Sequence, residues 1–146
     1  MEHDAQLHWE SVWRDGEPTE VSWFQADPAT SRRLIARVAR PQSAIIDVGG
    51  GGSRLVDHLL DDGFRDLTVL DISEAALDVS RRRLGDRAAA VEWIVDDVTE
   101  YRSDRRLDVW HDRAVFHFLV DVEDRERYRS TLAANVVPGG HVVVAT

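Results

Sequence analysis

The sequence predicts an α/β fold in which about five mostly parallel strands alternate with helices that cover both faces of the sheet. Short apolar runs alternate along the chain with segments whose apolar residues recur at helical spacing. The first run closes on Asp47 and is followed by four glycines, and the second ends at Asp71, 24 positions later. Parallel neighbours need a crossover connection, which is nearly always right-handed. These observations together predict a doubly wound, Rossmann-like sheet.

The strands are predicted from apolar runs bounded by turn residues. The first begins at Ala44 and stops at the glycines, which permit the positive φ of a tight turn and a close approach of the backbone to a ligand. The other strands are expected at residues 66–71, 91–95, 107–110 and 142–145.

The helices are predicted from capping residues and from apolar positions that repeat on one face. In order, they are 29–39 after Asp27-Pro28, Leu55 to Gly63, Ser73 to Leu84, and a last helix marked by Tyr128, Leu132 and Val136 and broken by Pro138-Gly139-Gly140.

Composition bounds the class of protein. At 146 residues the chain is expected to form a single domain, with 1–40 as an N-terminal helical lid and 41–146 as the core. The absence of cysteine excludes disulfides, thiolate zinc sites and a cysteine nucleophile. The formal charge of −9, from 18 basic and 27 acidic side chains, argues against a nucleic-acid partner. No apolar run reaches the roughly 20 residues of a membrane span and no signal region begins the chain, so we expect a cytoplasmic protein with no membrane partner.

Acidic residues stand where the predicted strands end. They are Asp47 in the first strand, Asp71 after the second, Asp96 and Asp97 after the third, and Asp112 just past the fourth. The carboxyl ends of parallel strands share one edge of the sheet, where ligands of such folds bind. The sequence therefore predicts a ligand site lined by carboxylates at this edge.

Four short segments occur in a fixed order along this fold. They are Asp47-Val48-Gly49-Gly50-Gly51-Gly52-Ser53, Leu70-Asp71-Ile72-Ser73, Asp96-Asp97-Val98 and Val137-Pro138-Gly139-Gly140. In that order they resemble the first motif, the ribose-binding acid, the adenine-edge motif and the turn before the fifth strand of class I S-adenosylmethionine-dependent methyltransferases. Ser53 stands at the third glycine position of the first motif. The resemblance covers residues 44–146 and implies S-adenosylmethionine as cofactor and S-adenosylhomocysteine as product.

Two further segments are similar to one branch of this family. Trp110-His111-Asp112-Arg113-Ala114 resembles the Asp-Arg-Gly or Asp-Lys-Gly segment of thiopurine-methyltransferase-like enzymes and of several protein-lysine methyltransferases, with Ala114 in place of the usual glycine. The leader His8-Trp9-Glu10-Ser11-Val12-Trp13 resembles the tryptophan-containing segment that those enzymes fold over the cofactor.

The family's sheet continues past its fifth strand, whereas this sequence ends there. Residues 142–145 are then an apolar edge strand, and an edge of that kind is expected to pair with something. The alternatives are that the chain lacks the family's C-terminal strands or that a second copy covers the edge in a homodimer.

The resemblance implies a role for each cofactor-binding residue. Asp71 would accept hydrogen bonds from the ribose hydroxyls and Asp97 from the adenine amino group, while Gly49 and Gly51 let the chain pass close to the methionine part. Asp47 would hold the loop or reach the ligand's ammonium, directly or through water. The full predicted set is Asp47, Gly49, Gly51, Asp71, Ile72, Asp97, Val98 and Trp13.

Catalysis by such an enzyme requires mainly positioning, because the sulfonium methyl group is already activated. A general base is needed only for an acceptor that arrives protonated. His111, Asp112 and His117 are the candidates, since they lie near the expected acceptor side. The histidine spacing matches no zinc pattern, so no metal is expected.

The sequence thus predicts a methyltransferase that moves a methyl group to a nucleophilic N, O or S of a small molecule. The alternatives are a protein-lysine methyltransferase, a truncated non-catalytic module that only binds the cofactor, and a nicotinamide oxidoreductase. Against the last, the turn after Asp71 lacks any dinucleotide-binding feature. The expected partners are accordingly a small-molecule or protein acceptor.

Overall fold

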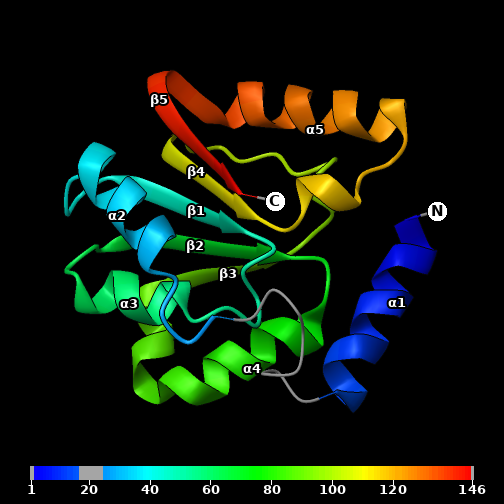
Figure 1. Cartoon of the computed structure of the whole chain (residues 1–146), viewed down its shortest axis with the longest axis horizontal. Helices are drawn as coiled ribbons and strands as arrows, with labels where there is room; N and C mark the ends of the chain where they lie inside the picture. Colours follow the sequence, from blue (N-terminus) through cyan, green and yellow to red (C-terminus); the bar gives the residue numbers. More distant parts are fainter. Residues whose placement is uncertain (1, 17–24, 146) are drawn as a thin grey trace.

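The structure is a computed structural model that describes residues 2–16 and 25–145, and its centre is a five-stranded sheet (Figure 1). The strands are β1 (Ala44–Val48), β2 (Asp66–Asp71), β3 (Val91–Val95), β4 (Leu107–Arg113) and β5 (Val136–Ala145). Their order is β3-β2-β1-β4-β5, and every neighbouring pair is parallel. The order reverses beside β1, so the loops after β1 and β4 diverge and leave room for a ligand. The predicted Rossmann-like α/β fold is confirmed.

Helices cover both faces of the sheet, as the alternation predicts. α2 (Ala29–Val38), α3 (Leu55–Asp61) and α4 (Glu74–Leu84) pack on one face, and α5 (Val122–Asn135) packs on the other. α1 (Glu2–Asp15) stands across the carboxyl ends of the strands (Figure 1). Two 3-10 helices, η1 (Gly85–Ala90) and η2 (Phe116–Phe118), follow α4 and β4. Of the segment predicted as a lid, α1 therefore lies at the strand ends and α2 lies on the sheet, while 17–24 fall outside the described residues.

Two apolar clusters hold the layers together. On the first face, fully buried Ile35, Leu59 and Leu77 come one from each of α2, α3 and α4 and pack on the sheet. On the second face, Trp110 of β4 packs edge-to-face on Tyr128 of α5, with ring centroids 5.8 Å apart. Burial of a large apolar side chain stabilises the fold by roughly 1.5–3 kcal/mol, so these clusters fix the layers that carry the loops of the site.

β4 extends to Arg113, three residues beyond its predicted end. The prediction stopped at 110 because the following His111 and Asp112 are polar. Both side chains are nevertheless buried and find partners inside the molecule, which removes the cost of burying them. An apolar pattern cannot reveal such partners, because they come from β1 and from the following turn.

β5 begins at Val136, six residues before its predicted start, so the expectation that Val136 belongs to the last helix was wrong. The pairing with β4 shifts register: Leu107 pairs with Val136 and Val109 with His141. Residues 137–140 fill this irregularity, and Gly139 has a φ of +80° there. The proline and glycines therefore shape a bulge within the strand, where the helix has already ended at Asn135.

The N-terminus of α2 also differs from the predicted cap. Pro28 occupies the N-cap position, and no side chain caps the helix. Asp27 instead accepts a hydrogen bond from the Arg32 guanidinium at 3.1 Å.

β5 forms one edge of the sheet and pairs with β4 alone. Val142 and Val144 on this strand are 43% and 45% exposed. The homodimer through this edge stays a prediction. Among the described residues, no helix has both the length and the apolar character needed to cross a membrane.

Candidate functional site

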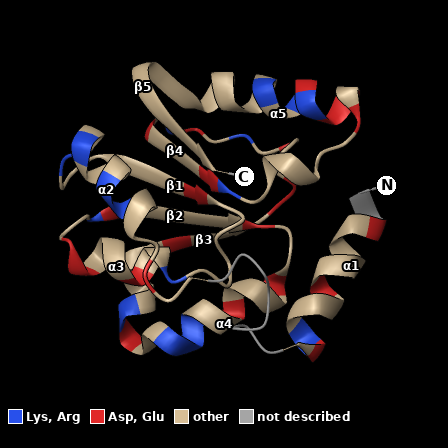
Figure 2. Cartoon of the chain, viewed as in Figure 1, with Lys and Arg blue, Asp and Glu red and all other residues tan. Residues whose placement is uncertain are grey.

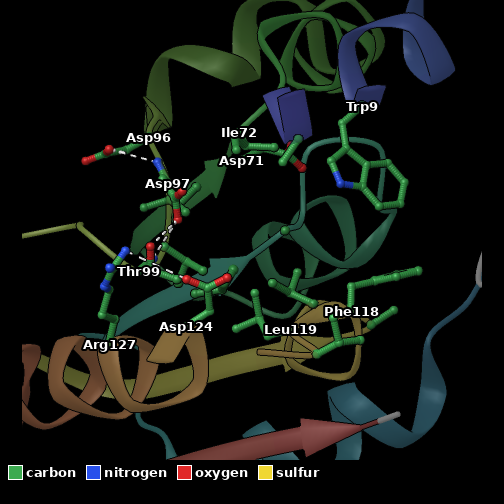
Figure 3. A pocket seen from close by; sticks show the side chains of 18 of the residues that line it. Trp9, Asp71, Ile72, Asp96, Asp97, Thr99, Phe118, Leu119, Asp124 and Arg127 are labelled. Carbon is green, nitrogen blue, oxygen red and sulfur yellow. Dashed lines mark hydrogen bonds and ion pairs between the residues drawn. The ribbon is translucent and has the colours of Figure 1, made fainter. Parts of the chain in front are cut away.

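A cavity of about 1110 Å³ lies at the carboxyl ends of the strands (Figure 3). Its walls come from the ends of β1 and β2, the loop after β3, the segment from the end of β4 to the first turn of α5, and α1. Six of the residues predicted to bind the cofactor line it, namely Trp13, Gly49, Asp71, Ile72, Asp97 and Val98. Asp47 and Gly51 are outside the lining.

The glycine turn brings the backbone of β1 to the cavity. Gly49 has a φ of +70°, and its N–H donates to the carbonyl oxygen of Leu70 at 2.7 Å. A Cβ at this position would lie 2.1 Å from Cγ2 of Val115, which also lines the cavity. Glycine is required here both for the left-handed conformation and for the close approach of the two loops.

Gly51 lies behind the cavity wall and holds Asp71 in place. Its N–H donates to Asp71 Oδ2 at 3.0 Å. The other carboxylate oxygen, Oδ1, accepts the N–H of Ser73 at 2.9 Å. Each oxygen keeps a further lone pair, so Asp71 can also accept two hydrogen bonds from a diol in the cavity. The position of Asp71 and its remaining acceptor sites therefore fit the ribose hydroxyls of an adenosyl group.

Burial raises the pKa of the Asp71 carboxyl to about 6, against the opposing effect of its two backbone hydrogen bonds. In the free protein this group therefore favours folding most below its ordinary pKa, and that contribution is lost as the pH rises through about 6. The affinity for a diol ligand should instead rise as the pH rises through about 6, because hydroxyl donors favour the ionised carboxylate.

We therefore expect S-adenosylhomocysteine to release up to about half a proton from Asp71 when it binds at pH 6, and almost none at pH 8. Isothermal titration at pH 6 in two buffers of different ionisation enthalpy measures this number directly. The release should vanish in Asp71→Asn, which cannot ionise. An equal heat of binding in both buffers at pH 6 would contradict the role of Asp71.

Asp97 begins the turn that follows β3. Its Oδ1 accepts both the N–H of Thr99 at 2.8 Å and the Thr99 hydroxyl at 2.7 Å, which rigidifies the turn. Asp96 accepts the N–H of Asp97 at 2.8 Å, so its carboxylate turns back on its own loop. Figure 3 shows Asp97 and Thr99 at the opposite end of the cavity from Trp9 and Phe118.

Asp47 is buried behind the glycine turn. Its Oδ1 lies 2.8 Å from His111 Nδ1, and the other ring nitrogen of His111 lies 2.8 Å from the Ser31 hydroxyl. Asp47 Oδ2 has no hydrogen-bond partner within the described parts of the chain, and a Cβ on Gly50 would lie 2.2 Å from it. The carboxylate thus lies directly under the turn, where it supports the loop.

None of the three candidate catalytic residues lines the cavity. His111 links β4 to β1 and α2. Asp112 is completely buried and accepts hydrogen bonds from the N–H groups of Val115 and Phe116 and from the Tyr128 hydroxyl. His117 is exposed on η2. The geometry therefore places these residues in the framework around the cavity.

The sequence did not single out residues 119–124 of the lining as site residues, whereas Trp9 belongs to the leader that was predicted to fold over the cofactor. Half-buried Arg113 ends β4 and donates to the Gln25 side chain, and burial lowers the pKa of its guanidinium. The resemblance of 110–114 to a family motif was the available signal for Arg113. Residues 119–124 carry no periodic pattern, so no local signal pointed to them.

Ala114 adopts a φ of +75°, the only non-glycine residue with a positive φ in the described chain. This conformation costs an alanine about 1 kcal/mol relative to glycine. We expect Ala114→Gly to raise the free energy of unfolding by up to about 1 kcal/mol, measured by urea denaturation. An Ala→Gly change at exposed Ala133 of α5 is the control and should destabilise the protein by a similar amount. Destabilisation by Ala114→Gly would contradict the prediction.

α1 closes one side of the cavity through three contacts. Glu10 accepts the N–H of Ala75 at the start of α4 at 3.3 Å. The rings of Trp9 and Phe118 meet edge-to-face, with centroids 5.1 Å apart. The Trp13 ring lies on Gly52, where an added Cβ would be 2.0 Å from a ring carbon. The helix is thus placed by the glycine turn, by α4 and by η2 at the same time.

Comparisons with known proteins agree with this geometry. Residues 45–140 match a family described as a methyltransferase domain. Nodulation protein S of Rhizobium tropici is 27% identical over 141 residues, which are 96% of this chain and 56% of that protein. The eEF1A lysine and N-terminal methyltransferase of Mus musculus is 24% identical over 64% of this chain and 13% of its own length.

A similar fold has been solved with the expected cofactor. The glycopeptide N-methyltransferase MtfA complexed with S-adenosyl-L-methionine has a TM-score of 0.69 and 21% identity, over 80% of this chain and 52% of that one. The chain thus spans little more than half of nodulation protein S and of MtfA, and a much smaller share of the eEF1A methyltransferase. Since the family match covers most of the chain, the protein belongs to the methyltransferase domain family.

Proposed function

We propose that the protein transfers the methyl group of S-adenosylmethionine to an amine nitrogen of a small molecule. The observation that carries the choice of acceptor is the charge of the cavity. Six carboxylates line it, namely Asp71, Asp96, Asp97, Asp121, Glu123 and Asp124, against the guanidinium groups of Arg113 and Arg127. Figure 2 shows acidic residues at the start of α5, which borders the cavity. Such a lining attracts a cationic ligand and disfavours an anionic one.

The residues that would hold the cofactor are those placed around the cavity. Asp71 would accept hydrogen bonds from the ribose hydroxyls and Asp97 one from the adenine amino group, and Ile72 and Val98 would contact the rings. The loop at Gly49 would hold the methionine part. When bound, the cofactor supplies an activated methyl group, so the protein's task is to align the acceptor nitrogen with it.

An amine enters the cavity mainly as its ammonium ion and must lose a proton before it attacks. Asp121 and Glu123 are exposed at the start of α5 and line the cavity, so their carboxylates attract the ammonium ion, whose proton passes to bulk solvent before the nitrogen attacks. The buried candidates His111 and Asp112 have no access to an acceptor there.

A protein lysine is the second candidate acceptor. It is supported by the likeness to the eEF1A lysine and N-terminal methyltransferase, and a lysine side chain carries the same ammonium group. Transfer to O or S, membership of the thiopurine-methyltransferase-like branch, a non-catalytic cofactor-binding role and a cytoplasmic location stay predictions from the sequence.

Titration of the protein with S-adenosylhomocysteine, beside NAD, tests the cofactor. We expect saturable binding at one site per chain, and tighter binding of NAD would contradict the proposal. Methyl transfer from radiolabelled S-adenosylmethionine to matched primary amines, alcohols and thiols then tests the acceptor. Glu123→Gln should raise the KM for the amine with little change in S-adenosylhomocysteine affinity. Exclusive transfer to the thiol or alcohol would overturn the amine proposal.

A further inference from the structure

Two carbonyl groups of the glycine turn are held on the side away from the cavity by side chains of α4. The Ser80 hydroxyl on α4 donates to the carbonyl oxygen of Gly51, and Ser80 is completely buried. Arg83, one turn further along α4, donates from Nη2 to the carbonyl oxygen of Ser53 at 2.9 Å. Both contacts are made away from the cavity, and neither residue lines it.

Arg83 is itself fixed by Asp57 of α3. Its Nε and Nη2 donate to the two oxygens of that carboxylate, at 2.9 and 2.6 Å, and both side chains are 18% exposed. Such a bidentate pair is stronger and more directional than a single ion contact. The guanidinium is therefore held in one plane, which aims Nη2 at the loop.

Arg83 also determines which way the Ser80 hydroxyl points. Nη2 has three acceptors for its two protons, so one N–H is shared, and Ser80 Oγ at 3.0 Å is among them. That oxygen is therefore an acceptor toward Arg83, and its single proton is directed to Gly51. The Gly51 N–H donates in turn to Asp71 Oδ2. Gly51 is thus held on both sides, its carbonyl oxygen by Ser80 and its N–H by the carboxylate that faces the cavity.

We propose that Asp57, Ser80 and Arg83, here called the loop brace, are positioning residues for the cofactor. They hold the peptide groups at Gly51 and Ser53 in one orientation, and through Gly51 they orient Asp71. The inference rests on the proposed function, because it takes the cavity as the S-adenosylmethionine site. These three residues then orient the cofactor-binding turn in addition to joining α3 to α4.

The chain contains a matched control for the loop brace. Arg87 of η1 pairs with Asp61 of α3 at 2.7 Å, so it also joins α3 to the segment that follows α4. Within the described residues, Arg87 makes no contact with the glycine turn, and the pair is about half exposed. Arg87→Gln therefore removes an ion pair between neighbouring elements without touching the loop.

The experiment compares Arg83→Gln and Arg83→Lys with Arg87→Gln. We expect both Arg83 variants to weaken S-adenosylhomocysteine binding about tenfold by titration, since lysine cannot reproduce the fork of contacts. They should also speed amide hydrogen exchange at Gly51 and Ser53 about tenfold relative to the β1 amides. Arg87→Gln should change neither quantity. Unchanged exchange at Gly51 and Ser53 in Arg83→Gln would overturn the proposal, whatever the affinity.

A charge swap tests whether Arg83 acts by positioning the glycine turn or only by joining α3 to α4. The double variant Asp57→Arg/Arg83→Asp can restore the ion pair between α3 and α4, but an aspartate at 83 has no donor for the Ser53 carbonyl. We expect it to recover thermal stability relative to Arg83→Asp alone without recovering affinity or slow exchange. Full recovery of both the S-adenosylhomocysteine affinity and the slow exchange at Gly51 and Ser53 would overturn the proposal. If the unmodified protein binds no S-adenosylhomocysteine, the proposed function fails, while the exchange measurement still decides the brace.

Discussion

Replacing Gly51 by alanine is expected to weaken S-adenosylhomocysteine binding at least tenfold and to lower the free energy of unfolding by about 1–3 kcal/mol. An alanine Cβ would lie 2.7 Å from both the Ala76 Cβ and Asp71 Oδ2, and 3.0 Å from the backbone carbon of Ala76. Backbone cannot yield as a flexible side chain does, so α4 or the glycine turn must shift. Either movement displaces Asp71 from its hydrogen bond with the Gly51 N–H.

Gly63→Ala is the control for this change. Gly63 has a φ of +91°, so alanine is strained there too, but its Cβ would meet nothing within 4 Å among the described residues. It should cost about 1 kcal/mol of stability and leave the affinity unchanged. Denaturant titration and calorimetric binding measure both quantities. Wild-type affinity in a folded Gly51→Ala protein would show that the close packing at Gly51 does not position the site.

Replacing Asp112 by alanine should destabilise the protein by about 3–5 kcal/mol. The carboxylate is completely buried and accepts from two backbone N–H groups and the Tyr128 hydroxyl, and each donor left without a partner costs about 1–3 kcal/mol. Asp112→Asn keeps one acceptor oxygen, so it should lower the free energy of unfolding by about half as much as the alanine variant. Tyr128→Phe removes one donor and leaves the Trp110 N–H unpaired, at about 1–2 kcal/mol.

The pH dependence distinguishes Asp112 from an ordinary packing residue. Burial raises the pKa of this carboxyl, against the hydrogen bonds that favour its ionised form. Its titration therefore adds stability below the ordinary pKa, and that contribution is lost as the pH rises through the raised value. Urea denaturation from pH 4 to 8 should show a shallower decline in Asp112→Asn than in the wild type. An identical pH profile would contradict the raised pKa.

The parts of the site that follow from local sequence were predictable. The acid at the end of β2 and the glycines after β1 stand at fixed points of a strand-turn-helix unit, so Asp71 and Gly49 could be placed without a structure. Ser73 shows the same logic, because its hydroxyl accepts the N–H of Ala76 at 3.1 Å and caps α4 as expected.

Contacts between distant segments were not predictable in the same way. His111 was expected near the acceptor, yet its ring is enclosed by Asp47 and Ser31, which lie 64 and 80 positions away. The Trp9 ring reaches Phe118 on η2 only because α1 crosses the strand ends. Such pairs depend on how loops meet in space, and no periodicity within either segment encodes them.

The order of strands in the sheet has a consequence for how the chain acquires its shape during synthesis. β1 can pair with β2 soon after both are made, but its other neighbour, β4, follows only 64 positions later, where Asp47 meets His111. Parallel pairings over such separations form slowly, because the intervening loop must close first. We expect the half-sheet of β1, β2 and β3 to assemble early and the pairing of β1 with β4, which encloses His111, to follow later. Burial of the His111 side chain therefore indicates that β4 has paired with the half-sheet that contains β1.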